Sequence, residues 1–139
     1  MPGLRVLPEL KDRLAEVGVV VVKNKGTVLF RVGDEVTGVF LLQKGEIQLR
    51  NACDERVYGN RIVSAGAVIG LPATLSGRPY SLTAEVTKDA RLAFVPREVM
   101  VRLLKDNPNL SLEVMRLLSE EINVMRAAKL AKPREASAN

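Results

Sequence analysis

The residues best placed to do chemistry lie in the stretch SAGAVIGLPATLSGRPYSLTAEV, residues 64–86. Gly66 and Gly70 permit tight backbone turns, and the residues after Gly70 can form one short helical turn with Pro72 near its start. Exposed N–H groups at such a turn make a seat for a phosphate or another anion, and Thr83 would add a hydroxyl from the next strand. The alternative is a capped turn that closes one end of the fold and binds nothing.

Arg78 is the one cation of this stretch that could pair with a bound anion. It lies in a Ser-Gly-Arg-Pro turn, where an ordinary solvent-facing role is the alternative. A charge-assisted hydrogen bond from its guanidinium would favour a phosphate strongly. The candidate ligand-binding set is Gly70, Leu71, Pro72, Ala73, Thr74, Arg78, Thr83 and Ala84.

The absence of histidine from all 139 residues narrows the chemistry further. Zinc, copper and non-haem iron sites usually need imidazole, as do most Ser and Cys hydrolase mechanisms. The single cysteine, Cys53, sits beside two acidic residues that disfavour a thiolate. The acidic residues are scattered and form no calcium-type loop. We therefore expect no metal, no cofactor and no catalytic site.

The elements that would position the candidate site change in kind along the chain. Leu10, Leu14 and Val17 have helical spacing, which predicts a helix over residues 7–17 that Gly18 ends. Residues 19–95 alternate short apolar runs with turn residues about every ten positions, which is typical of an antiparallel sandwich or closed roll. Within it, Lys44-Gly45 and Lys88-Asp89 are interpreted as turns between strands.

Helical spacing returns after Pro96 and predicts two C-terminal helices over residues 97–131, separated at Asn107-Pro108. The second helix is apolar over more than one stripe. All of it could pack on the strands, or one side could pack on the same helix of a second copy as a short coiled coil. The second interpretation predicts a homodimer through Leu110, Val114, Leu117, Leu118, Ile122 and Met125.

Three segments together resemble the cyclic-nucleotide-binding domain, and in particular the sensor domains of Crp/Fnr regulators. They are KGTVLFRVGDEVTGVFLLQKGEIQLR (residues 25–50), the glycine-containing stretch already described, and VPREVMVRLLKDNPNLSLEVMRLLSEEI (residues 95–122). The resemblance implies a mainly β fold: a double-stranded β-helix, or jelly-roll β-roll, of about eight strands, with a short N-terminal helix and two C-terminal helices. It makes residues 1–139 a single domain, and it makes the glycine-containing stretch the family's phosphate-binding cassette.

The cassette departs from the family pattern at two positions. Nucleotide-binding members carry a glutamate for the ribose hydroxyl where this chain has Leu71, and an arginine for the cyclic phosphate where it has Leu82. An unpaired buried hydroxyl costs about 1–3 kcal/mol, and the missing arginine removes a bidentate phosphate partner. The resemblance therefore implies a degenerate cassette that does not bind cyclic AMP in the usual way.

The function we expect is a non-catalytic regulatory or sensor module, cytoplasmic and not bound to a membrane. Its partners would be a small anionic or nucleotide-like effector, a second copy of the chain and another protein. Direct DNA binding is not expected, because the sequence stops at Asn139 without the helix-turn-helix that Crp/Fnr regulators carry. One alternative is a genuine cyclic-nucleotide receptor that uses Arg78 in a rearranged cassette. The other is a cupin-like enzyme, which the absence of histidine disfavours.

Overall fold

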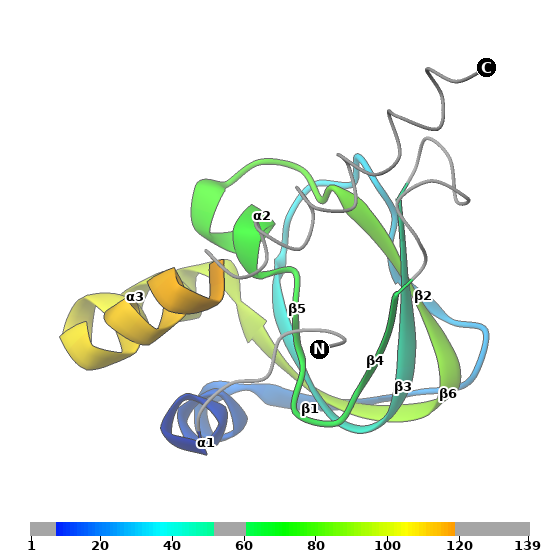
Figure 1. Cartoon of the computed structure of the whole chain (residues 1–139), viewed down its shortest axis with the longest axis horizontal. Coiled ribbons are helices and arrows are strands. Elements are labelled where there is room, and N and C mark those ends of the chain that lie inside the picture. The colour runs from blue at the N-terminus through cyan, green and yellow to red at the C-terminus, as the bar shows by residue number, and fades with distance from the viewer. Residues whose placement is uncertain (1–7, 52–60, 119–139) are drawn as a thin grey trace, which may run out of the picture.

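The computed structural model describes residues 8–51 and 61–118. The strands form one strongly curved antiparallel sheet, with helices gathered at one side of it (Figure 1). The sheet order is β1-β6-β3-β4, while β2 also pairs with β6 and β5 with β3. The elements are α1 (Pro8–Val17), β1 (Val19–Lys23), β2 (Val28–Phe30), β3 (Gly38–Asn51), β4 (Arg61–Ser64), β5 (Val68–Ile69), α2 (Leu71–Ser76), β6 (Leu82–Pro96) and α3 (Arg97–Asp106). The predicted fold class, a mainly β roll with flanking helices, is confirmed.

Two long strands form the frame of the roll. β3 and β6 pair antiparallel from Gly38 opposite Pro96 to Asn51 opposite Leu82. Side chains alternate along β3, so that Ile47 and Leu49 are buried while their neighbours are not, as expected for a strand with one face on a core.

The turns predicted at Lys44-Gly45 and Lys88-Asp89 are wrong. Both dipeptides lie inside continuous strands, opposite each other at a register shift between β3 and β6. Gly45 has φ of +99°, and a Cβ there would lie 2.4 Å from the carbonyl oxygen of Asp89. The chain bends at this bulge and does not reverse. Six strands therefore appear in the described residues, where about eight were expected.

α1 packs on the strands through the residues that its spacing predicted. Leu10 and Leu14 are almost fully buried, and the Gly18 N–H donates to the Leu14 carbonyl at 2.9 Å where the helix ends. At the other end of the chain, Asn107 separates α3 from the helix over residues 108–118, as predicted. Its side-chain amide donates to the Leu103 carbonyl at 2.8 Å, and its own carbonyl accepts the Leu110 N–H at 2.9 Å.

The buried side chains form two clusters on either side of the curved sheet. The helix-side cluster joins the helices to the outer side of the roll: Leu10, Leu14, Val39, Leu41, Val68, Leu71, Ala93, Val95, Met100, Leu103, Leu110, Val114 and Leu117. The roll-interior cluster fills the inside of the roll: Phe30, Phe40, Leu42, Ile47, Leu49, Val63, Ala67, Ile69, Ala73, Tyr80, Ala84, Val86, Ala90 and Leu92. Within the described ranges, no helix is long and apolar enough to cross a membrane.

Candidate functional site

The predicted cassette is a short helix with a glycine at each end. Gly70 follows β5 with φ of +87° and precedes the first residue of α2, and Gly77 ends the helix with φ of +76°. The Gly77 N–H donates to the Ala73 carbonyl at 2.8 Å. Thr74 is fully buried, and its hydroxyl donates to the Gly70 carbonyl at 2.8 Å. The Thr74 side chain thus stabilises the helix from within and is turned away from any ligand.

The first turn of α2 has few hydrogen-bond donors for a bound anion. Pro72 has no N–H to donate. The Leu71 side chain is fully buried in the helix-side cluster, and Ala73 is 8% exposed, in the roll-interior cluster. Within the helix itself, only Leu71 and Ala73 have N–H groups that precede the first intrahelical hydrogen bond, from the Thr74 N–H to the Gly70 carbonyl at 3.1 Å, and no side-chain hydrogen bond caps the helix start.

Tyr80 and Phe30 occupy the roll interior directly beside the cassette. Their rings stack with centroids 3.8 Å apart and planes 10° apart, and a Cβ on Gly70 would lie 3.1 Å from the Tyr80 ring. The Tyr80 hydroxyl donates to the Gly38 carbonyl at 2.7 Å and accepts the Thr37 and Gly38 N–H groups, each at 3.2 Å. The pair is therefore a fixed part of the core, held by stacking and by hydrogen bonds.

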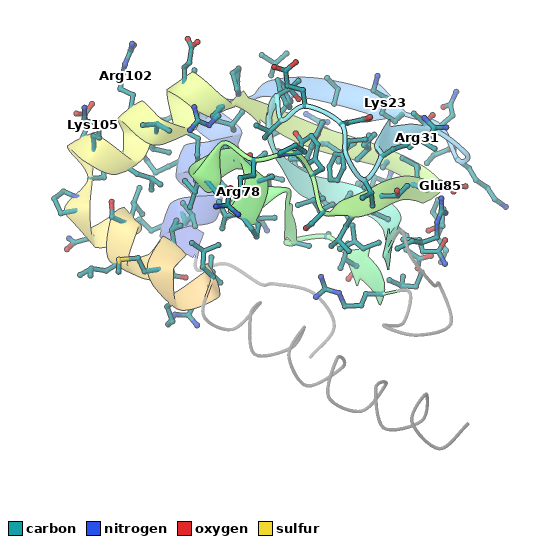
Figure 2. All side chains as sticks on the ribbon, turned by 90° about the horizontal axis from the view of Figure 1, so that it is seen from above. Lys23, Arg31, Arg78, Glu85, Arg102 and Lys105 are labelled. Carbon is teal, nitrogen blue, oxygen red and sulfur yellow. The ribbon has the colours of Figure 1, made fainter. Side chains whose placement is uncertain are left out.

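The remaining candidates do not converge on a common point. Arg78 is exposed at the surface over α2 (Figure 2), and its backbone N–H donates to the Ser76 hydroxyl at 3.2 Å. Thr83 accepts the Val32 N–H at 3.1 Å. Ala84 is fully buried inside the roll.

A different arginine contacts the cassette, and sequence reasoning missed it. Arg97, at the start of α3, donates from Nε to the Thr74 carbonyl at 2.8 Å, and its guanidinium lies 3.0 Å from where a Cβ on Gly77 would stand. It satisfies one of the free carbonyls at the end of α2. Because the two partners are separated by 23 positions in sequence, no local pattern indicates the contact.

The residues predicted to form a dimer face divide into two groups. Leu110, Val114 and Leu117 are buried in the helix-side cluster of their own chain, and Leu118 packs against it. Ile122 and Met125 lie outside the described residues. The exposed apolar side chains of the helix over residues 108–118 are instead Leu112 and Met115, at 66% and 61%.

No cluster of metal-ligating side chains assembles in the part of the chain that the structure describes. No three acidic or cysteine side chains gather there. Among the labelled basic side chains, Arg102 and Lys105 lie on α3 at one end of the molecule and Lys23 and Arg31 at the other (Figure 2). Cys53 lies outside the described residues.

The curved antiparallel sheet and the glycine-capped helix between β5 and β6 define a β-roll with one short helix inserted between its strands. The family model described as the cyclic nucleotide-binding domain matches residues 20–107. This chain belongs to the cyclic nucleotide-binding domain family, as its sequence predicted.

Curated relatives place the similarity among regulators. The fumarate and nitrate reduction regulatory proteins of Escherichia coli K12 and Salmonella typhimurium are each 32% identical over 102 residues, which cover 71% of this chain and 40% of the relative. The Klebsiella oxytoca protein of that name is 31% identical over the same length. These relatives are regulatory proteins by name, and this chain matches less than half of their length.

Solved structures agree on the fold. The catabolite activator protein of Thermus thermophilus superposes with a TM-score of 0.73 at 21% identity, over 94% of this chain and 60% of that one. A transcriptional regulator from Thermotoga maritima superposes with a TM-score of 0.70 at 19% identity, over 84% and 92%. A structure titled "A cyclic-GMP-dependent signalling pathway regulates bacterial phytopathogenesis" gives a TM-score of 0.77 at 22% identity, over 86% and 95%.

Proposed function

We propose that this chain is a non-catalytic regulatory module whose cassette does not bind cyclic nucleotides in the manner of the family. The observation that carries the proposal is the Phe30–Tyr80 stack, which fills the roll interior beside Gly70. Opening that space for a ribose phosphate would break the stack and leave the Gly38 backbone groups without the Tyr80 hydroxyl. Unmade hydrogen bonds of buried groups cost about 1–3 kcal/mol each, so a nucleotide would bind against a large penalty.

The side chains around the cassette support the same conclusion. Leu71 points into the helix-side cluster and presents no carboxylate to a ribose. Leu82 packs on the roll-interior cluster and presents no guanidinium to a phosphate. The family position supports regulation over catalysis, because the curated relatives are named as regulatory proteins.

Isothermal titration calorimetry with cyclic AMP and cyclic GMP tests the proposal. We expect no saturable heat for either nucleotide up to about 1 mM, the range of weak non-specific binding. The variant Arg78→Ala should behave like the wild type. Micromolar binding by the wild type would contradict the proposal, and its loss in Arg78→Ala would establish the rearranged cassette instead.

We also propose that the module dimerises through the outward side of the helix over residues 108–118. Leu112 and Met115 are three residues apart, so they share one helix face, and that face is opposite the buried Val114. Leu112 borders a hollow of about 440 Å³ between this helix and α1, which the Arg116 side chain also lines. Exposed leucine beside a hollow suits knobs-into-holes packing with a second copy.

A further inference from the structure

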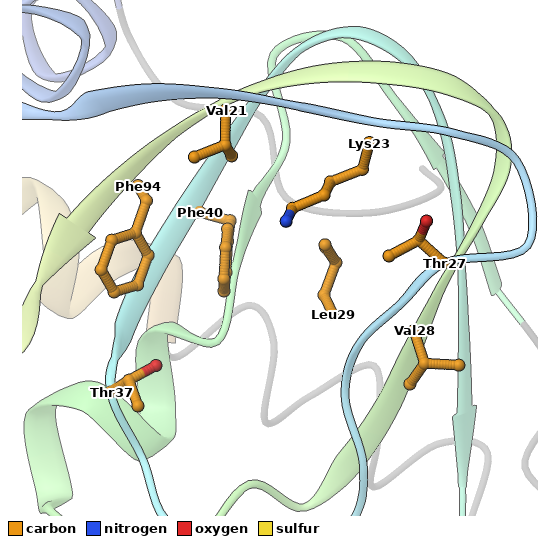
Figure 3. A pocket seen from close by; sticks show the side chains of 8 residues that line it. All are labelled: Val21, Lys23, Thr27, Val28, Leu29, Thr37, Phe40 and Phe94. Atoms are coloured by element: carbon orange, nitrogen blue, oxygen red, sulfur yellow. The ribbon is translucent and has the colours of Figure 1, made fainter.

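An apolar pocket opens between β1, β2 and the start of β3, at the border of the roll-interior cluster. Its volume is about 400 Å³, within the range of small-molecule sites. The lining side chains are Val21, Lys23, Thr27, Val28, Leu29, Thr37, Phe40 and Phe94 (Figure 3). Lys23 is the one charged group among them.

Strand register explains why a lysine points into this pocket. Val20 and Val22 are 48% and 69% exposed, whereas Val21 and Lys23 are half-buried. Since alternate side chains of a strand share a face, the latter two face inward. Lys23 lies opposite Ala90 in β6, a small buried residue that leaves space beside the lysine.

The Lys23 ammonium has no protein partner in the described residues. Among residues 8–51 and 61–118, no side chain forms an ion pair or hydrogen bond with its Nζ. The nearby Asp89 carboxylate accepts the Lys25 backbone N–H at 2.7 Å. A half-buried cation facing Leu29 and Phe40 loses part of its hydration and gains no counter-charge.

We infer that this pocket binds a small carboxylic acid with an apolar body. The carboxylate would pair with Lys23, and the apolar part would lie against the Val21, Phe40 and Phe94 side chains. A single lysine matches one negative charge, whereas a doubly charged phosphate favours arginine forks or backbone N–H cradles, and no arginine lines this pocket. The inference rests on the pocket alone and does not depend on whether the cassette binds a nucleotide.

Lys23 could instead have a purely structural role, in which the pocket binds no ligand. β1 ends the described sheet order, and an inward-pointing charge on an edge strand can serve only to prevent edge-to-edge association. In that case Lys23 would protect the strand from aggregation and bind nothing.

Titration of the full 139-residue chain with sodium octanoate, followed by ¹H–¹⁵N NMR, separates the two. We expect saturable shifts at Val21, Leu29 and Phe94, with Kd below about 1 mM. Lys23→Met keeps the apolar stem and removes the charge, and it should weaken octanoate binding about tenfold or more. Lys23→Arg should stay within about threefold of the wild type.

Two controls make the result specific. Lys25→Met removes an exposed lysine outside the pocket and should leave octanoate binding unchanged. Octanol has the same chain length as octanoate but no charge, so the wild type and Lys23→Met should bind it with the same affinity. No saturable shifts up to about 10 mM, shifts confined to another surface, or equal octanoate binding by Lys23→Met would each overturn the inference.

Discussion

Tyr80 joins the cassette end of the roll to the beginning of β3. Its hydroxyl satisfies both backbone groups of Gly38, which lies 42 positions earlier in the sequence, while its ring stacks on Phe30. Because Tyr80 is 3% exposed, no water can replace these hydrogen bonds easily. One residue therefore fills the roll interior beside Gly70 and fastens it to the start of β3.

The first residue-scale prediction concerns this hydroxyl. Tyr80→Phe keeps the ring but leaves the Gly38 N–H and carbonyl without their buried partner, so we expect the free energy of unfolding to fall by about 1–3 kcal/mol. Urea denaturation measures the change. Ser81→Ala alters an exposed neighbour and should change stability by less than about 0.5 kcal/mol. Equal stabilities of the two variants would contradict the assigned role of the hydroxyl.

At the scale of elements, the bulge opposite Gly45 lets two long strands curve into a roll. A Cβ at Gly45 would meet the Asp89 carbonyl oxygen at 2.4 Å and the Ala90 Cα at 2.7 Å. Both contacts are with backbone, which cannot rotate away. Only glycine combines the positive φ with this close approach.

Two glycine variants distinguish the cost of a positive φ from the cost of a steric overlap with an added Cβ. Gly26 has φ of +96° with nothing within 4 Å of its would-be Cβ, so Gly26→Ala should cost only the left-handed backbone, about 1–2 kcal/mol. Gly45→Ala adds a steric overlap, for a total of about 3–5 kcal/mol. Chemical denaturation of both variants checks the order. Similar costs for the two variants would contradict a steric overlap between a side chain at position 45 and the β6 backbone.

The elements also show how far the sequence can be interpreted alone. The helical spacing of Leu10, Leu14 and Val17 is a local pattern, and the helix that it predicts, ended by Gly18, is confirmed in α1. The turn at Lys44-Gly45 was predicted from residue type, but glycine serves a bulge as well as a turn, and only the pairing with β6 distinguishes them. The contact of Arg97 with α2 joins distant segments, so no local pattern could indicate it.

At the scale of the whole molecule, the sheet separates two apolar clusters with different roles. The roll-interior cluster closes the cassette end of the roll. The helix-side cluster buries Leu110, Val114 and Leu117 against α1 and α3, which fixes the helix over residues 108–118 on the roll. The opposite face of that helix is therefore exposed to solvent. A dimer formed through this face would fix the orientation of the two modules relative to each other.

Sedimentation equilibrium at micromolar concentration tests this interface. We expect the wild type to be a dimer and Leu112→Glu to raise the dimer Kd at least about thirtyfold, because a buried hot-spot side chain contributes about 2 kcal/mol or more. Val22→Glu provides the control, since Val22 on β1 is 69% exposed against 66% for Leu112, and it should leave the dimer intact. A monomeric wild type would contradict the helix interface, and dissociation by Val22→Glu alone would move the contact to the β1 edge, where exposed valines follow one another along the strand.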